Sequence, residues 1–133
     1  MWKIKIDRAD TIFSQFIRIR DGRCMRCGSP VAFNGAGMPV SHQCSHYFSR
    51  GRESTRFNPE NADTFCFTCH ELMEKEKQDK KEYRGEYTMF KVRQLGENGF
   101  KILKMLAYSY KRKDRKQSLM IVKALLKSLN QQI

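Results

Sequence analysis

The sequence predicts a small α+β protein in which a bound metal ion holds short strands and helices together. Three observations predict this fold class. Two Cys-x2-Cys pairs are separated by residues 28–65, that interval contains short apolar segments divided by turn residues, and both flanks show helical periodicity. The 133 residues suit one compact module with a helical appendage.

The first predicted helix covers residues 7–21. Its apolar side chains fall on one face at helical spacing: Ile12, Phe13, Phe16 and Ile17. Gly22 follows as a helix stop, and the next turn contains Gly28 and Pro30, which interrupt regular structure. The helix should therefore bury one face and end just before the first cysteine pair.

The interval between the cysteine pairs predicts short extended segments rather than helices. Residues 31–39 have the turn chemistry of a small hairpin, and residues 40–48 favour an extended segment. Residues 49–61 indicate a basic loop. A helix is expected to begin near Phe67 and to continue through residue 83, with charged pairs at i,i+4 along its exposed part.

Amphipathic segments predict a helical C-terminal extension. Residues 88–96 end at a glycine cap, residues 99–111 begin another helix, and residues 118–130 form the last one. The last segment carries an apolar stripe: Leu119, Val122, Leu125, Leu126 and Leu129. We expect the stripe to pack inside the molecule, although it could also form a homodimer interface. The predicted parts are a core at 1–84 and a basic helical extension at 85–133.

The charge of the chain indicates a polyanionic partner. It has 26 Lys and Arg against 14 Asp and Glu, a formal net charge of +12. Nucleic acid is the commonest such partner, and a merely soluble basic surface is the alternative. No apolar segment resembles a signal peptide or approaches a membrane span of about 18 residues. We therefore expect a cytoplasmic protein with reduced cysteines and no membrane partner.

The four paired cysteines predict a structural zinc site. Cys24 and Cys27 form one pair, and Cys66 and Cys69 form the other. Two such turns can direct four thiolates at one Zn²⁺ ion, whereas a thiol-redox pair is the weaker alternative. A site with four protein ligands is closed, so it serves as scaffold. The fifth cysteine, Cys44, is expected to be a small buried apolar residue.

Two histidines then remain for chemistry. His70 directly follows the last zinc cysteine, and His46 lies in the extended segment inside the zinc loop. If the fold brings them together, one could bind a divalent cation while the other accepts a proton from water. Phosphodiester hydrolysis needs both functions. Taken singly, each histidine is more often a structural residue.

The segment NADTFCFTCH, residues 61–70, resembles the distal half of the HNH (ββα-metal) nuclease motif. Together with residues 13–28 and 43–70, it is similar to the phage NinG/Rap recombination endonucleases, and residues 87–106 also resemble the helical tail of that family. A looser likeness to the phage endonuclease VII type rests on the two cysteine pairs and an intervening histidine. The resemblance implies a zinc-stapled ββα-metal (HNH) core with an N-terminal helix and a helical C-terminal extension.

The resemblance also implies roles for individual residues. His46 would be the general base, and His70 would bind a catalytic Mg²⁺ or Mn²⁺ ion. Asn61 would orient His46 or brace the loop, and a capping role is the alternative. The implied substrate is DNA in branched or recombination intermediates, such as Holliday junctions or D-loops, cut in the cytoplasm of a phage-infected cell.

One position departs from the family pattern. Many HNH enzymes place a second metal ligand immediately before the base, where this chain has Ser45. Hard cations prefer carboxylate oxygens, so the missing ligand must come from elsewhere. The candidates are Asp63, Glu53 and His42, or else water and DNA phosphates.

Basic residues in two segments are predicted to contact nucleic acid. Arg50, Arg52 and Arg56 lie in the loop that would face the DNA backbone, although a solvated loop is nearly as common. The densest basic run, residues 110–116, is predicted to contribute Lys111, Arg112 and Lys113, although a bare charge run is more often a solvated linker. Two alternatives to a junction-cutting endonuclease stay open: a non-catalytic zinc module that binds DNA, and an HNH nuclease acting on linear duplex.

Overall fold

The computed structural model describes residues 5–77 and 85–130 of the chain. Five α-helices and a two-stranded antiparallel sheet are present in these ranges, so the predicted α+β class is confirmed. The elements follow in the order α1 (Arg8–Asp21), β1 (Gln43–His46), α2 (Glu53–Arg56), the 3-10 helix η1 (Pro59–Asn61), β2 (Ala62–Phe65), α3 (Phe67–Lys77), α4 (Glu86–Ala107) and α5 (Arg115–Asn130).

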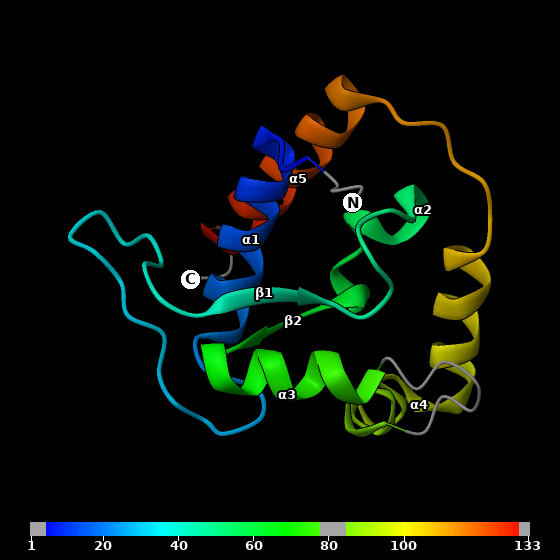
Figure 1. Cartoon of the computed structure of the whole chain (residues 1–133). Coiled ribbons are helices and arrows are strands. Elements are labelled where there is room, and N and C mark those ends of the chain that lie inside the picture. Colours follow the sequence, from blue (N-terminus) through cyan, green and yellow to red (C-terminus); the bar gives the residue numbers. More distant parts are fainter. Residues whose placement is uncertain (1–4, 78–84, 131–133) are drawn as a thin grey trace.

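The two strands form the centre of the molecule, with helices on both sides. Strand β1 pairs with β2 so that Ser45 lies opposite Asp63 and His46 lies opposite Ala62. Figure 1 shows α1 and α5 on one side of this ribbon and α3 and α4 on the other. A two-stranded sheet is marginally stable alone, so both of its faces need such cover.

Helix α1 begins and ends as the sequence predicts. The Asp7 and Asp10 side chains form a capping box, and Gly22 ends the helix with a positive φ of 68° that glycine adopts readily. The predicted apolar face packs inward, with Phe13 and Ile17 fully buried against the last helix. Val122 of α5 is also fully buried there. The apolar stripe of α5 thus lies against α1, as predicted, and a homodimer stays a prediction.

Helix α4 consists of two helical arms that meet at Gly96, where the sequence predicts the end of one helix and the start of the next. It is bent at Gly96, whose φ of 78° and ψ of 165° are not helical. The part before the bend packs on α3 and on the sheet, and the part after it covers the segment that follows β1 through Phe100 and Leu103. One hydrophobic cluster therefore contains residues from both sides of the predicted division at 84, and the division itself stays a prediction.

The other elements expected from the sequence are present, with one difference in the loop after β1. Residues 49–61 contain α2 and η1 instead of an uninterrupted loop. Helix α3 begins at Phe67 as predicted, and the expected continuation beyond 77 lies outside the described residues. The expected hairpin is present as a bridge between Phe33 and Pro39. Within the described ranges, every helix is too short or too polar to cross a membrane.

Candidate functional site

The four paired cysteines meet in one cluster. Cys24 and Cys27 follow α1, whereas Cys66 and Cys69 lie at the start of α3, and their four sulfur atoms lie within 4.8 Å of one another. Four thiolates at this separation fit a tetrahedral zinc ion, with no position left for a substrate. The predicted metal-compatible scaffold is therefore confirmed, and its ion would join the turn after α1 to the helix that carries His70.

Neighbouring groups adjust the charge of this cluster. The hydrogen bond with Ser29, 3.3 Å from the sulfur, lowers the pKa of Cys27 to about 6. Burial raises the pKa of Cys69 to about 12, which a bound cation would reverse by stabilising the thiolate. Arg26 donates a hydrogen bond to the Cys69 sulfur and another to Glu86 at the start of α4. The four-cysteine cluster is thus linked to the first turn of α4.

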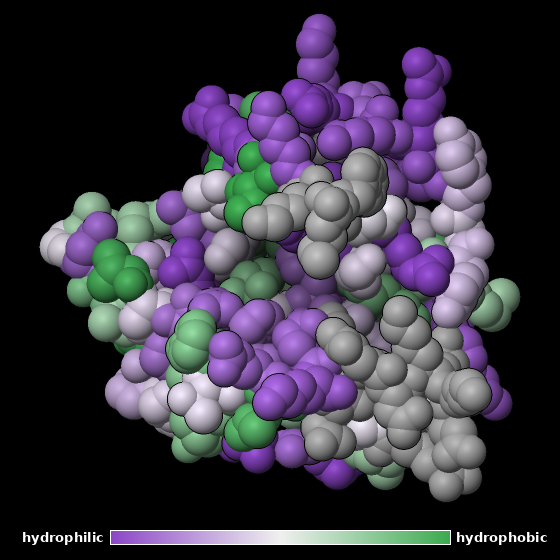
Figure 2. Space-filling model, in the orientation of Figure 1, coloured by the Kyte–Doolittle hydropathy of each residue, from purple (hydrophilic) through white to green (hydrophobic). Residues whose placement is uncertain are grey.

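A separate cleft of about 600 Å³ runs along the outer edge of β1. Its walls come from α1, β1, the loop after β1 and α3, and both His46 and His70 line it. Figure 2 shows that this face of the molecule is mainly hydrophilic and is hollowed between the helices above and below β1. The fold therefore brings the two predicted histidines into one open site.

His46 is held in one tautomer. Its Nε2 atom lies 2.9 Å from the backbone oxygen of Arg56, and its ring packs beside Phe13. A carbonyl oxygen only accepts hydrogen bonds, so Nε2 must carry the proton. In the neutral ring, Nδ1 then has the lone pair. This is the protonation pattern that a general base needs.

His70 is oriented by Ser45. The Oγ atom of Ser45 forms a short hydrogen bond with Nδ1 of His70, and the serine side chain is almost completely buried. Because Nδ1 is engaged by Ser45, any cation held by His70 would bind at Nε2. Ser45, expected only as the place of a missing metal ligand, thus orients the candidate ligand on α3, His70.

Glu74 is a site residue that sequence reasoning missed. It follows His70 by one helical turn, and both line the cleft. The spacing His-x3-Glu on a helix is the signal that could have identified it. Asp10 of α1 also lines the cleft.

The suggested substitutes for the missing ligand lie elsewhere. Glu53 and Asp63 are engaged in ion pairs with Arg56 and Lys91, respectively. The ring of His42 is hydrogen-bonded to serine side chains, and none of these three candidates lines the cleft. In this arrangement none of the three candidates is placed to share a cation with His70, which leaves the other alternative considered, water and DNA phosphates.

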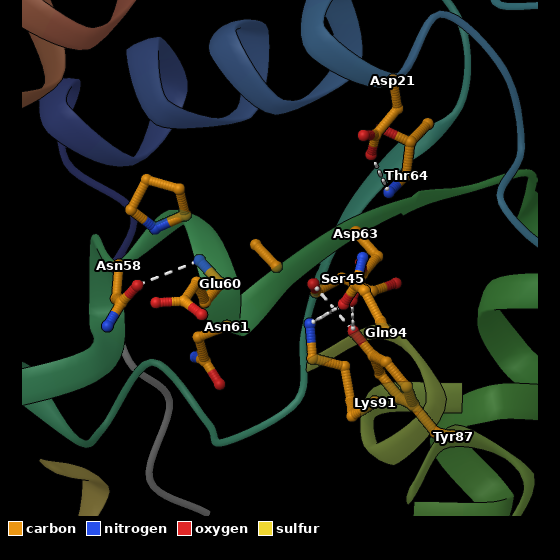
Figure 3. Close-up of polar contacts among 12 residues, drawn as sticks. Asp21, Ser45, Asn58, Glu60, Asn61, Asp63, Thr64, Tyr87, Lys91 and Gln94 are labelled. Carbon is orange, nitrogen blue, oxygen red and sulfur yellow. Dashed lines mark hydrogen bonds and ion pairs between the residues drawn. The ribbon is translucent and has the colours of Figure 1, made fainter. Parts of the chain in front are cut away.

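A buried polar network supports the strand behind the cleft (Figure 3). Lys91 and Gln94 of α4 donate hydrogen bonds to the two carboxylate oxygens of Asp63, at 3.1 and 3.0 Å. The Tyr87 hydroxyl lies 3.1 Å from both Asp63 Oδ2 and the backbone oxygen of Ser45. Burial lowers the pKa of Lys91 and raises that of Tyr87. Helix α4 therefore holds β1 at the residue that orients His70.

Asn61 braces the loop after β1. Its Oδ1 atom accepts a hydrogen bond from the backbone nitrogen of Phe48, and its Nδ2 atom donates to the backbone oxygens of Phe48 and Thr55. The side chain is fully buried. Of the roles considered, these contacts match bracing, while Asn58 is the residue that caps η1. Asn61 therefore supports His46 indirectly, through the backbone of the loop that follows β1.

The three loop arginines have different environments. Arg56 is buried and donates to both carboxylate oxygens of Asp10, so its predicted contact with phosphate is wrong. Arg52 stacks over the Tyr108 ring at 4.2 Å. Arg50 lines the cleft, where its guanidinium lies 3.7 Å from Asp10. Only Arg50 is placed beside the two histidines.

The predicted basic run lies away from the cleft-lining residues. Lys111, Arg112 and Lys113 are exposed in the segment between α4 and α5, where they line a second hollow of about 630 Å³ with the start of α5. Their contact with nucleic acid stays a prediction.

No protein-family model, curated protein or solved structure matches the chain.

Proposed function

We propose that the chain is a metal-dependent endonuclease of the HNH type that hydrolyses phosphodiester bonds in DNA. The observation that carries the proposal is the single cleft in which His46 has the tautomer of a base and His70 is oriented by a buried serine. The succession of β1, β2 and α3, joined to the four-cysteine cluster, also supports it. The net charge of +12 favours a DNA substrate.

The residues of the cleft divide the reaction between them. Nδ1 of His46 accepts the proton of the attacking water. His70 and Glu74 would hold a Mg²⁺ or Mn²⁺ ion, which supplies charge stabilisation for the phosphorane and the leaving oxygen. No group of three or more ligands beside the cysteine cluster occurs among the described residues, so water and phosphate oxygens would complete the shell. Arg50 is placed to contact the same phosphate.

The proposal is tested by replacing His46 with alanine in the full chain. With Mg²⁺ or Mn²⁺ supplied, loss of a general base should slow cleavage by about 10²- to 10⁴-fold while zinc content and DNA binding persist. The matched control is His42→Asn, because His42 lies outside the cleft and asparagine tolerates its positive φ of 66°. Cleavage that survives in His46→Ala removes this residue from the role of base.

The choice of DNA substrate is part of the same proposal. The branched or recombination intermediate is favoured by the family resemblance, and linear duplex is the alternative. Four-way junction, flap, duplex and single-stranded DNA should be compared with and without cation. A chain that binds these substrates but cuts none of them in either cation is a zinc-containing DNA-binding module instead.

A further inference from the structure

The segment 31–40, called here the 31–40 hairpin, projects from the molecule beside the cleft. It leaves the body of the protein between α1 and β1, at the left of Figure 1. Its tip is exposed over residues 32–37, and it includes the large apolar side chains of Phe33 and Val40, which are 44% and 60% exposed. In Figure 2, hydrophobic atoms gather on this projection, whereas the face beside it is mainly hydrophilic.

The hairpin is ordered by its own hydrogen bonds. The backbone nitrogen of Asn34 donates a hydrogen bond to the backbone oxygen of Met38. The Oδ1 atom of Asn34 accepts hydrogen bonds from the backbone nitrogens of Met38 and Ala36. Gly37 has a φ of 76°, which glycine adopts without the steric cost that other residues meet. A closed turn of this kind orders the backbone that carries the Phe33 ring before any ligand binds, which lowers the entropy lost on binding.

The base of the hairpin is attached to the wall of the cleft. Arg18, which lines the cleft, donates through Nη1 to the backbone oxygens of Pro39 and Ser41. Only two residues, Ser41 and His42, separate the hairpin from Gln43, which also lines the cleft. A ligand that occupies the cleft and continues past Gln43 therefore meets the 31–40 hairpin.

The charge of the surrounding sequence identifies the ligand class. Residues 22–52 contain no aspartate or glutamate and four arginines: Arg23, Arg26, Arg50 and Arg52. The arginines that line the cleft are Arg18, which bonds the base of the hairpin, and Arg50. An exposed aromatic ring beside such groups suits a nucleic acid, because arginine attracts phosphate while the ring stacks on a base. A second copy of this chain, which also has a net charge of +12, would lack such charge complementarity.

We propose that the 31–40 hairpin is a wedge whose Phe33 ring stacks on a base at the branch point of the DNA held in the cleft. This deepens the proposed function and rests on it for the identity of the ligand. In linear duplex every base is already stacked, so insertion must break a stacked step at a cost of a few kcal/mol. A branch point has bases that are less well stacked, so the wedge favours branched DNA.

The geometry also limits where the chain cuts. Phe33 is bridged to Pro39, and seven residues lead from Pro39 to His46. With a strand spacing of about 5 Å and at most about 3.5 Å per residue, the wedge and the base lie within about 30 Å of each other. At about 3.4 Å per nucleotide, cleavage should fall within about ten nucleotides of the branch.

The test measures binding of the full chain to a four-way junction and to a linear duplex of the same arm sequence, in Ca²⁺ without Mg²⁺ or Mn²⁺. Phe33→Ala should weaken junction binding by about 5- to 150-fold, the range for one lost stacking contact, and duplex binding by less than about 2-fold. Phe33→Trp should keep junction binding close to that of the wild type, whereas Phe33→Leu should weaken it as Phe33→Ala does. Met89→Ala removes an equally exposed apolar residue of α4 and is the control.

A fluorescent 2-aminopurine base at the branch provides a direct readout. Wild-type chain should quench it by stacking, and Phe33→Leu should not. Full quenching with Phe33→Leu, or equal losses on junction and duplex, overturns the wedge. A Phe33 variant that leaves DNA binding intact but lowers the sedimentation coefficient overturns it too, because the hairpin would then contact a second copy.

The inference and the proposed function can fail separately. A wild-type chain that binds junction and duplex equally overturns the wedge, even if His46-dependent cleavage of duplex upholds the nuclease. Conversely, the chain could bind junctions selectively through Phe33 and yet cut no DNA in Mg²⁺ or Mn²⁺. That result upholds the wedge and overturns the nuclease.

Discussion

The ammonium group of Lys91 lies 3.1 Å from Oδ2 of Asp63, and neither side chain is exposed to solvent. This ion pair joins the C-terminal part of the chain to β2, directly opposite Ser45 in the sheet. The Tyr87 hydroxyl lies between the same carboxylate and the backbone oxygen of Ser45, so the pair is linked through Tyr87 to the residue that orients His70. Helix α4 is therefore part of the structure that supports the candidate site.

Replacing Lys91 with methionine should destabilise the protein strongly. The change leaves the Asp63 carboxylate buried without its cation, which typically costs about 3–5 kcal/mol in free energy of unfolding. Urea denaturation of the zinc-loaded chain measures this. Lys101→Met, on the exposed side of α4, is the matched control and should stay within about 0.5 kcal/mol of wild type. A cost below about 1 kcal/mol for Lys91→Met would mean that water reaches the carboxylate.

Ser45→Ala should weaken binding of the catalytic cation without disturbing the zinc cluster. Loss of a hydrogen bond that orients a metal-binding histidine typically lowers metal affinity by about 10- to 100-fold. Titration with Mn²⁺, followed by electron paramagnetic resonance, measures the affinity, and elemental analysis reports the zinc. Ser14→Ala, on the α1 wall of the cleft, serves as control. Unchanged Mn²⁺ affinity would show that His70 keeps its orientation without Ser45.

The four-cysteine cluster predicts one tightly bound zinc ion per chain. Cys66→Ser should abolish stoichiometric zinc and lower the melting temperature markedly, because structural zinc sites typically contribute about 10–16 kcal/mol of binding free energy to folding. Cys44→Ser is the control, since Cys44 lies outside the cluster and should retain the ion. Elemental analysis and thermal melts distinguish the two variants. Zinc loss from both would place Cys44 in the coordination shell.

The Asp10 carboxylate should stabilise the protein at neutral pH and lose this effect in acid. Burial raises the pKa of Asp10, but the hydrogen bond from Arg56, the Asp7 backbone and nearby positive charge outweigh it and lower the pKa below 3.8. A lowered pKa in the folded state gives stability that is present above the unfolded value and is lost as pH falls through the folded one.

Asp10→Asn should therefore cost about 3 kcal/mol in free energy of unfolding, by the same amount at pH 8 and pH 5. The difference from wild type should shrink only below about pH 4, where the carboxyl begins to be protonated. Denaturation at several pH values measures it, with exposed Glu97→Gln as the control that should change little at any pH. If the difference in free energy of unfolding between wild type and Asp10→Asn already shrinks between pH 8 and pH 5, the pKa of Asp10 is not lowered.

The elements that the sequence predicts well are those with strong local signals. Helix α1 has a capping aspartate, an apolar face and a terminal glycine, and each of these acts within a few residues. The same holds for the start of α3 and for the stripe of α5. Short helices such as α2 were missed because they depend on distant partners, here the ion pair between Arg56 and Asp10.

The candidate site shows the same limit. Both histidines and all four paired cysteines were predicted as site residues from spacing and residue chemistry, and the fold brings the histidines into one cleft and the cysteines into one cluster. The role of Ser45 and the burial of Asp63 depend on which residues of α3 and α4 face the sheet, and sequence separation does not reveal this. Glu74 was identifiable in principle, because its spacing from His70 is a helical repeat, whereas the internal use of Arg56 was not.

The change of direction at Gly96 determines what α4 can reach. A straight helix of 22 residues would extend for about 33 Å and leave the sheet after a few turns. Because the backbone turns there, Tyr87 and Phe100 both contact the same Tyr47 ring, one from each arm. The two arms of α4 thus enclose the end of the strand that carries His46, and the angle between them depends on one residue without a side chain.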